Sequence, residues 1–200
     1  IAQMVAKMTI EPMIDPLFHP DSYGYRPNKS AHQALAITRE RCWRYDWVID
    51  LDIQGFFDHV DHSLLMNVVK HYVKEKWVIL YIERWLKTPS PSLDKLGTLV
   101  VPTQGIAQGG VISPLLANLF LHIAFDSWIS REHPNHPFER YADDMIIHTH
   151  TRQEAENLLE AIIQRLQKCN LAINPEKTKI VYCQQDKKNG IKEDYPTIQF

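Results

Sequence analysis

Apolar positions recur at helical spacing in several stretches of the chain. Positions 1, 4, 5, 8 and 10 are apolar, which predicts that the chain opens on a helix. A second helix is expected after Ser30, a residue that favours the N-cap, because a turn rich in Gly, Pro and Asn precedes it. The same spacing predicts further helices over 62–73, 75–87, 114–131 and 152–169.

Short apolar runs predict the strands. The run WVIDLDI (47–53) indicates a buried strand with Asp50 and Asp52 on one face. FERYA and MIIHT indicate a hairpin, TKIVYC (178–183) a further strand, and 88–105 a loop with one short strand. This order of elements predicts an α+β fold, a split βαβ antiparallel sheet with helices packed on one face.

Short polar residues and tryptophans refine these expectations. Asp58 and Asp61 are candidates to cap the helix that follows them, and Ser113 is a candidate to cap the helix over 114–131. The five tryptophans fall mostly at apolar positions and are expected in the core rather than on a base-stacking surface.

Composition places the chain among ordinary globular proteins. It is 44% hydrophobic and 23% charged, which excludes disordered, collagen-like and coiled-coil classes. The net charge of −2 lacks the basic balance expected of a nucleic-acid-binding protein. The longest apolar stretch, 111–125, is too short and too often interrupted to cross a bilayer, so no membrane partner is expected. Three widely spaced cysteines fit a reducing compartment.

Three acidic residues form the candidate catalytic centre. Asp52 ends a strand, and Asp143 and Asp144 lie at the hairpin turn, so an antiparallel sheet can bring them together. Neighbouring carboxylates raise one another's pKa, and a divalent cation removes that cost. Oxygen ligands suit Mg²⁺, and two ions about 4 Å apart can support in-line phosphoryl displacement. An Asp-Asp pair alone is more often a solvated turn, but the upstream segment DIQGFFD favours the metal site.

Five segments in order resemble the reverse transcriptases encoded by bacterial and organellar group II introns. They are SYGYRPNKSAHQAL (22–35), WVIDLDIQGFFDHVDHSLL (47–65), TQGIAQGGVISPLLANLFLH (103–122), RYADD (140–144) and LAINPEKTKIVY (171–182). The resemblance covers nearly the whole chain and implies a right-hand polymerase. Residues 1–45 would be part of the fingers and 46–200 the palm, interrupted near 75–105 by fingers-like elements.

The resemblance implies a role for each matching residue at the reaction centre. Asp52, Asp143 and Asp144 would be the catalytic carboxylates and, with Ile53, would bind two Mg²⁺ ions, for which Mn²⁺ can substitute. Phe57 would lie beneath the sugar of the incoming nucleotide and exclude a 2′-hydroxyl. Phe56 is the alternative for that role, and either ring could simply pack in the core.

Further residues are implied around the nucleotide and the template. Gln108 would contact the incoming nucleotide, and Lys177 would approach the triphosphate, although a solvated lysine is the competing interpretation. The residues implied to hold template and primer are Arg26, Lys29, Gly109 and Gly110. A surface turn fits Arg26 and Lys29 equally well, and Ala107 stands where the family usually has Pro.

The implied function is an RNA-directed DNA polymerase that extends a DNA primer on an RNA template with dNTPs. The full-length protein would also bind group II intron RNA and assist splicing and mobility. Two alternatives stay open: an RNA-binding splicing cofactor in which polymerisation is secondary, and a reverse transcriptase serving retrons, diversification or phage defence.

The ends of the chain and its surroundings complete these expectations. Ile1 and the helical opening indicate a fragment that lacks the thumb and the upstream fingers, so weak or no activity is expected of it alone. The expected location is the bacterial cytoplasm or an organelle. The oligomeric state stays open, with a homodimer among the alternatives.

Overall fold

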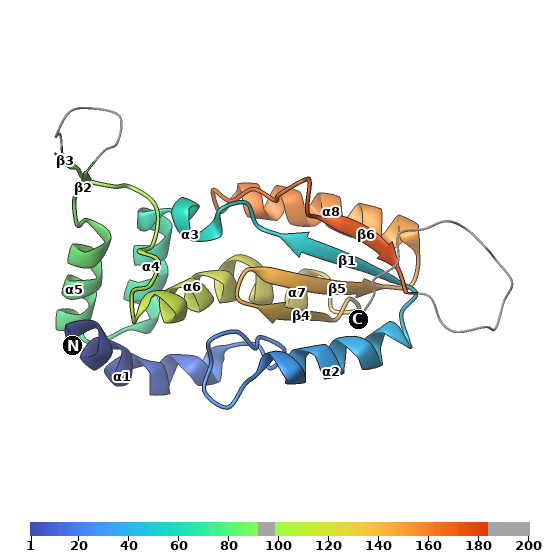
Figure 1. The fold of residues 1–200 in the computed structure, drawn as a ribbon, viewed down its shortest axis with the longest axis horizontal. Coiled ribbons are helices and arrows are strands. Elements are labelled where there is room, and N and C mark those ends of the chain that lie inside the picture. The colour runs from blue at the N-terminus through green and yellow to red at the C-terminus, as the bar shows by residue number, and fades with distance from the viewer. Residues whose placement is uncertain (92–98, 184–200) are drawn as a thin grey trace, which may run out of the picture.

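A computed structural model of the chain describes residues 1–91 and 99–183. Its centre is a four-stranded antiparallel sheet in the order β4-β5-β1-β6 (Figure 1). The strands are β1 (Trp47–Asp52), β4 (Phe138–Tyr141), β5 (Asp144–Thr149) and β6 (Lys179–Tyr182). The expected α+β fold with an antiparallel sheet is confirmed.

Helices surround this sheet and extend beyond one end of it (Figure 1). They are α1 (Ala2–Ile14), α2 (Ala31–Cys42), α3 (Phe56–His59), α4 (His62–Tyr72), α5 (Lys76–Leu86), α6 (Ser113–Leu121), α7 (Ser127–Glu132) and α8 (Arg152–Gln167). The single-turn 3₁₀ helix η1 (Asp15–Leu17) follows α1, and two short strands, β2 (Ser90–Pro91) and β3 (Leu99–Val100), pair with each other.

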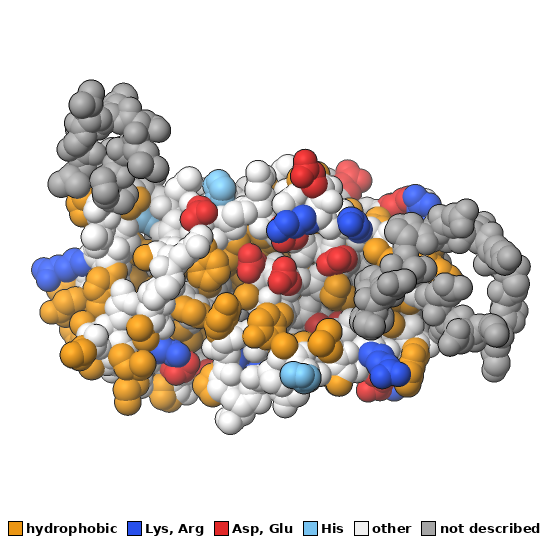
Figure 2. All heavy atoms as spheres, in the orientation of Figure 1, with side chains coloured by type: hydrophobic (Ala, Val, Ile, Leu, Met, Phe, Trp, Pro, Cys, Tyr) orange, Lys and Arg blue, Asp and Glu red, His pale blue; other side chains and the backbone are white. Residues whose placement is uncertain are grey.

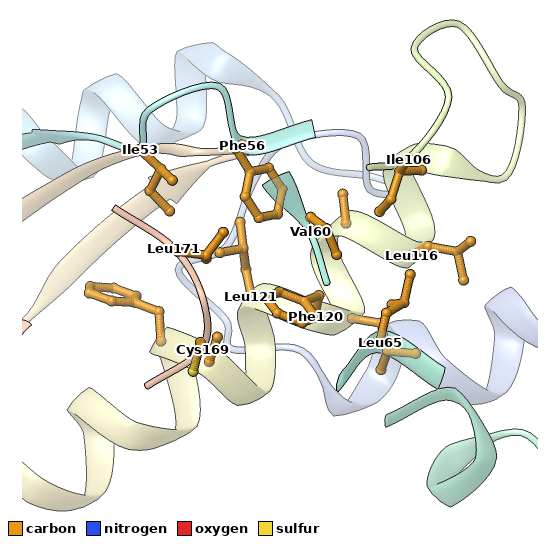
Figure 3. Close-up of a cluster of buried hydrophobic side chains, with 14 of the residues drawn as sticks. Ile53, Phe56, Val60, Leu65, Ile106, Leu116, Phe120, Leu121, Cys169 and Leu171 are labelled. Carbon is orange, nitrogen blue, oxygen red and sulfur yellow. The ribbon is translucent and has the colours of Figure 1, made fainter. Parts of the chain in front are cut away.

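The two faces of the sheet differ in chemistry because side chains alternate along a strand. Ile49 and Leu51 of β1 point into the main core together with Met145 and Ile147 of β5. Helices α6 and α8 contribute to that core, which continues under α3 and α4 (Figure 3). Asp52, one position on from Leu51, therefore belongs to the opposite face.

Helix starts follow local chemistry closely. Ser30 caps α2 through a capping box with Gln33, as expected for this residue. Asp61 caps α4 by accepting from the Leu64 backbone N–H at 2.9 Å, which confirms that expectation. Asp58 lies inside the short helix α3 instead of capping a helix, so that expectation was wrong.

The predicted helix over 114–131 is not continuous. A π-helical segment, η2 (His122–Asp126), separates α6 from α7. Ser113 is the first residue of α6 and donates to the Ala107 carbonyl at 2.7 Å, so it does not act as the cap. The π turn places Asp126 in the interior, where it is fully buried.

Two tryptophans depart from the expected core positions. Trp43 is 64% exposed and Trp77 is 43% exposed, because each lies on the outward side of its helical segment. Among the helices that the structure describes, none has the length and apolar character needed to cross a membrane.

Candidate active site

Strand register brings the acidic residues together. Asp52, the last residue of β1, is the cross-strand partner of Asp144, the first residue of β5. Directly opposed residues in an antiparallel pair have Cβ atoms about 5 Å apart. Asp143 precedes Asp144 in the turn between β4 and β5, and Asp50 lies on the same face as Asp52. Figure 2 shows acidic side chains gathered on this face with basic ones beside them.

The surroundings make these carboxylates difficult to ionise together. Burial raises the pKa of Asp143, and repulsion from Asp52 adds to this effect. Burial also raises the pKa of Asp144, which additionally experiences repulsion from Asp143, Asp52 and Asp50. A cation bound between the strands would relieve both effects, because it stabilises the charged form of each group.

Lys177 supplies the positive charge nearest to Asp52. Its Nζ donates to Asp52 Oδ1 at 3.1 Å, although the lysine side chain is 66% exposed. The hydrogen bond to Asp52 raises the pKa of Lys177. The loop that carries Lys177 is fixed to β1, since the Asn174 backbone N–H donates to the Asp52 carbonyl at 2.8 Å. The structure therefore brings Lys177 to the acidic residues.

The donor set fits a hard divalent cation, although the side chains are not gathered around one point. Carboxylate oxygens are the ligands that Mg²⁺ prefers. Among the residues that the structure describes, no three acidic, His or Cys side chains converge closely enough to hold one ion. Because Asp52 and Asp144 are cross-strand partners, side-chain rotation alone can bring their carboxylates toward each other. The Ile53 side chain is a hydrocarbon without donor atoms, so only its backbone oxygen could serve as a ligand.

A hollow of about 480 Å³ collects the residues expected at the nucleotide. Its lining includes Phe57, Gln108, Gly109 and Gly110, together with Tyr25 from the loop before α2. Phe56, in contrast, is only 2% exposed and packs in the core against Phe120 (Figure 3). The structure thus distinguishes the two aromatic residues by burial.

The Gly-rich loop is held against the turn that follows β1. The Ile106 backbone N–H donates to the Phe57 carbonyl at 2.6 Å, and Gln108 Nε2 donates to Asp58 Oδ1 at 3.3 Å. Gly109 has a φ of +79°, a conformation that a residue with a side chain rarely adopts. The loop therefore depends on glycine at this position.

Arg26 does not fit the expected template contact. All five of its N–H donors are used inside the chain, by Asp15 through its side chain and carbonyl and by the carbonyls of His19 and Ser22. Its side chain is only 7% exposed. Binding a template phosphate would require these bonds to break, so Arg26 instead joins the loop before α2 to the end of α1.

Lys29 also has partners within the chain. Its Nζ donates to the Pro20 carbonyl at 2.6 Å and lies 4.8 Å from the centroid of the Tyr23 ring. The template contact expected of Lys29 therefore competes with this internal bond.

Sequence reasoning missed a group of buried polar side chains beneath the turn that carries Asp143 and Asp144. Arg140, Asp126 and Asn118 are each at most 2% exposed, and Arg140 donates hydrogen bonds to both of the others. The available signal was an arginine inside an apolar strand, since an arginine is rarely buried without a partner.

Comparisons with known proteins agree with this geometry. A family model described as reverse transcriptase (RNA-dependent DNA polymerase) matches residues 1–194. Group II intron-encoded protein LtrA of Lactococcus lactis subsp. cremoris is 28% identical over 191 residues, which is 96% of this chain and 30% of that protein. Protein YkfC of Escherichia coli (strain K12) is 34% identical over 134 residues, 64% of this chain and 34% of that protein.

A shorter match links the chain to a plant protein. Nuclear intron maturase 1, mitochondrial, of Arabidopsis thaliana is 31% identical over 87 residues, 44% of this chain and 12% of that protein. The matched part of the chain therefore spans between 12% and 34% of the length of these relatives.

A solved structure shares the fold. Apo telomerase from Candida tropicalis, truncated from its C-terminal domain, superimposes with a TM-score of 0.66 at 14% identity, covering 96% of this chain and 42% of that one. At this identity the likeness concerns the fold alone. The family match, which extends over almost the whole chain, shows that the chain belongs to the reverse transcriptase family.

Proposed function

We propose that this chain carries the polymerase centre of a group II intron type reverse transcriptase, which adds deoxynucleotides to a DNA primer on an RNA template. The observation that carries the proposal is the pairing of Asp52 with Asp144, with Asp143 in the adjoining turn. After side-chain rotation, carboxylates from these two neighbouring strands would be able to share divalent ions. The similarity to LtrA supports the group II intron assignment.

The residues of the chain divide the work of the reaction. Asp52, Asp143 and Asp144 hold two Mg²⁺ ions, or Mn²⁺ in their place, with the Ile53 carbonyl as a further ligand. When bound, these ions polarise the attacking primer hydroxyl and neutralise the departing pyrophosphate. Lys177 contributes positive charge next to Asp52, where the triphosphate would lie.

The hollow beside the acidic residues receives the nucleotide. Phe57 limits the space at the sugar, and the loop before α6 contributes the polar side chain of Gln108 to the lining of the same hollow. Gly109 and Gly110 permit close approach of a backbone or a base, because they carry no side chain. Residues 1–45 would act as part of the fingers and 46–200 as the palm, interrupted near 75–105 by fingers-like elements.

The relatives suggest the cellular setting. They come from bacteria and from mitochondria, so we place the protein in a bacterial cytoplasm or in an organelle. Its partners would be the RNA template, the primer, dNTPs and a group II intron RNA.

Primer extension by the protein that carries this chain tests the proposal. The single variants Asp52→Asn, Asp143→Asn and Asp144→Asn should each lose extension by about 10³-fold, because each removes a ligand charge while retaining side-chain shape. Asp46→Asn, at an exposed acidic residue just before β1, should retain activity. Full activity in all three catalytic variants would refute the proposal.

A second function is supported by the similarity to a protein named as an intron maturase. Such a protein would assist splicing through RNA binding. The double variant Asp143→Asn/Asp144→Asn separates the two activities, since splicing assistance should persist while primer extension disappears. Loss of both at unchanged RNA affinity would mean that the two functions share the acidic centre.

A further inference from the structure

The turn that carries Asp143 has an unfavourable backbone conformation. Ala142, the residue before Asp143, has a φ of +58°. This left-handed conformation costs a residue with a Cβ about 1 kcal/mol or more, so surrounding contacts must maintain it. The position of both turn carboxylates depends on those contacts.

Arg140 makes the most extensive of these contacts. Its guanidinium is fully buried and forms two hydrogen bonds with Asp126, at 2.7 and 2.6 Å. The same group donates through Nη1 to the Ala142 carbonyl at 2.9 Å and to Asn118 Oδ1 at 2.8 Å. One planar side chain thus joins the catalytic turn to α6 and to the π segment η2.

Asn118 continues the connection to the loop before α2. Its Nδ2 donates to the Gly24 carbonyl at 2.7 Å. A Cβ at Gly24 would overlap with the backbone nitrogen of Ala142, so only glycine permits this approach. The next residue, Tyr25, lines the hollow that also contains Phe57 and Gln108.

We infer that Arg140 and Asn118 are positioning residues that fix the catalytic turn for metal binding and tie it to the wall of the nucleotide hollow. Neither side chain is placed to touch substrate, because both are buried beneath the turn. Arg140 sets the position of Ala142, and Asn118 holds the Gly24 loop against it. This inference rests on the proposed function, because it assigns these residues to the same carboxylate centre.

Lysine at position 140 is the informative substitution. Arg140→Lys retains a positive charge opposite Asp126, but one ammonium group cannot reproduce the planar set of bonds to Asp126, Asn118 and Ala142. We expect the Kd for Mn²⁺, measured by water-proton relaxation, to rise about tenfold, as is usual when a residue that supports metal ligands is changed. Asn118→Ala should also raise this Kd, although the ion pair between Asp126 and Arg140 stays intact in that variant.

Arg41→Lys is the matched control. Arg41 also forms ion pairs within the fold, with Asp21 and Glu139, and neither partner belongs to the turn over 141–144. Its Mn²⁺ affinity should stay within about twofold of the unchanged protein. Thermal unfolding of each variant without metal establishes that it is folded before affinity is compared. If Arg140→Lys does not fold, Asn118→Ala decides the question.

The Mn²⁺ affinities of these variants distinguish a failure of the proposed metal centre from a failure of the positioning role. If Asp52→Asn binds Mn²⁺ as tightly as the unchanged protein, the proposed metal centre itself fails. If Asp52→Asn loses the ion while Arg140→Lys and Asn118→Ala retain full affinity, the centre stands and the positioning role is refuted. Weakened affinity in both positioning variants, but not in Arg41→Lys, supports the inference.

Discussion

The neighbouring residues Phe56 and Phe57 show how burial separates a packing role from a candidate specificity role. Phe56 is almost fully buried, whereas Phe57 is half-buried and lines the nucleotide hollow. Their rings are 5.6 Å apart at 75°, an edge-to-face contact. Phe57 can therefore face a ligand while Phe56 supports it from the core.

Substitution of the two rings should have different effects. Phe57→Val enlarges the hollow and should reduce discrimination against ribonucleotides by about 10²-fold, the scale on which a pocket rejects an added hydroxyl. The measurement is the ratio of kcat/KM for dNTP and rNTP. Unchanged discrimination would remove Phe57 from the sugar-sensing role.

Phe56→Ala is the comparison for that experiment. It should lower the free energy of unfolding by about 3–5 kcal/mol in denaturant titrations, because it leaves a cavity in the core.

Lys177 has two candidate roles, charge neutralisation and proton donation. The hydrogen bond to Asp52 raises its pKa, so the side chain is positively charged in this contact, and charge neutralisation requires only that this charge is kept. Lys177→Arg should then stay within about tenfold of full kcat, while Lys177→Met should lose about 10²-fold. Arginine holds its protons at all accessible pH values, so an inactive arginine variant would instead indicate proton donation.

Lys179→Met provides the control for position 177. Lys179 lies on β6, and its charge acts on Asp50 rather than through a hydrogen bond to Asp52. Its loss should leave kcat close to that of the unchanged protein.

At the residue scale, Asp52, Asp144 and Lys177 lie together as the motifs predicted, whereas Arg26 has other partners than expected. Asp52, Asp143 and Asp144 belong to ordered motifs, and strand ends are recognisable from apolar runs. Arg26 was predicted to bind template because its turn resembles a phosphate site. Its actual acceptors come from Asp15, His19 and Ser22, and the path that brings those oxygens around one guanidinium is a tertiary property.

Helix caps are the element-scale features with the clearest energetic consequence. The Thr151 side chain accepts from the Glu154 N–H, and the Glu154 side chain accepts from the Thr151 N–H, so a capping box begins α8. Thr151→Ala should lower the free energy of unfolding by about 1 kcal/mol. Gln153 is an exposed residue in the same first turn of α8, and Gln153→Ala should change the free energy of unfolding much less. Equal effects of the two substitutions would contradict the capping role of Thr151.

The stability of the segment around η2 should respond to pH, because this segment contains His122. Burial lowers the pKa of His122, which outweighs the opposing charge of Asp126. The folded state then binds fewer protons than the unfolded state just below pH 6.5, so His122 contributes stability that is full above that pH and is lost as pH falls.

Unfolding titrations across that range test this assignment. As pH falls below 6.5, the free energy of unfolding of the wild-type protein should fall more steeply than that of His122→Gln. A difference between the two proteins that is the same at every pH does not bear on this test. Subtracting the free energies of unfolding of the two proteins at each pH cancels the effect of other histidines, such as His19, whose pKa is also lowered by burial. Parallel profiles would show that His122 is not responsible.

Periodicity predicted the types of the helices and strands but not their irregularities. The helices over 62–73, 75–87 and 152–169 agree closely with α4, α5 and α8 because their apolar faces are regular. The π segment at His122–Asp126 inserts one extra residue into a turn. Asp126, the last residue of this segment, pairs with the buried Arg140, and the apolar periodicity of the helix does not indicate that partner.

At the scale of the whole molecule, charge is distributed unevenly. The chain has a net charge of −2, and its acidic residues include the four carboxylates around the ends of β1 and β5. Such a surface repels phosphate unless cations occupy it. If the chain acts as proposed, we expect template binding to depend on divalent ions here and on basic side chains away from this surface.

RNA affinity of the protein that carries this chain should consequently depend strongly on salt. If six to ten phosphates are contacted, affinity should fall by about 10³–10⁵ between 50 and 200 mM salt. Filter binding or fluorescence anisotropy gives the slope. Affinity that is independent of salt would exclude an electrostatic mode of template binding.

The strand order of the sheet is a feature that the sequence patterns did not predict. The apolar runs predicted four strands of the sheet, yet nothing in them specifies the order β4-β5-β1-β6. That order makes Asp52 and Asp144 direct partners, although they are separated by more than ninety positions. Pairing register arises from packing of the whole sheet against its helices, which local patterns do not contain.

The most direct measurement is the anomalous diffraction of a crystal of the protein grown with Mn²⁺. We expect an anomalous peak that marks a Mn²⁺ ion about 2.2 Å from oxygens of Asp52 and Asp143, with Asp144 beside it. Lys177 should then be displaced from Asp52. A crystal at saturating Mn²⁺ with the acidic side chains ordered, no peak between β1 and β5, and Lys177 still bound to Asp52 would contradict this expectation.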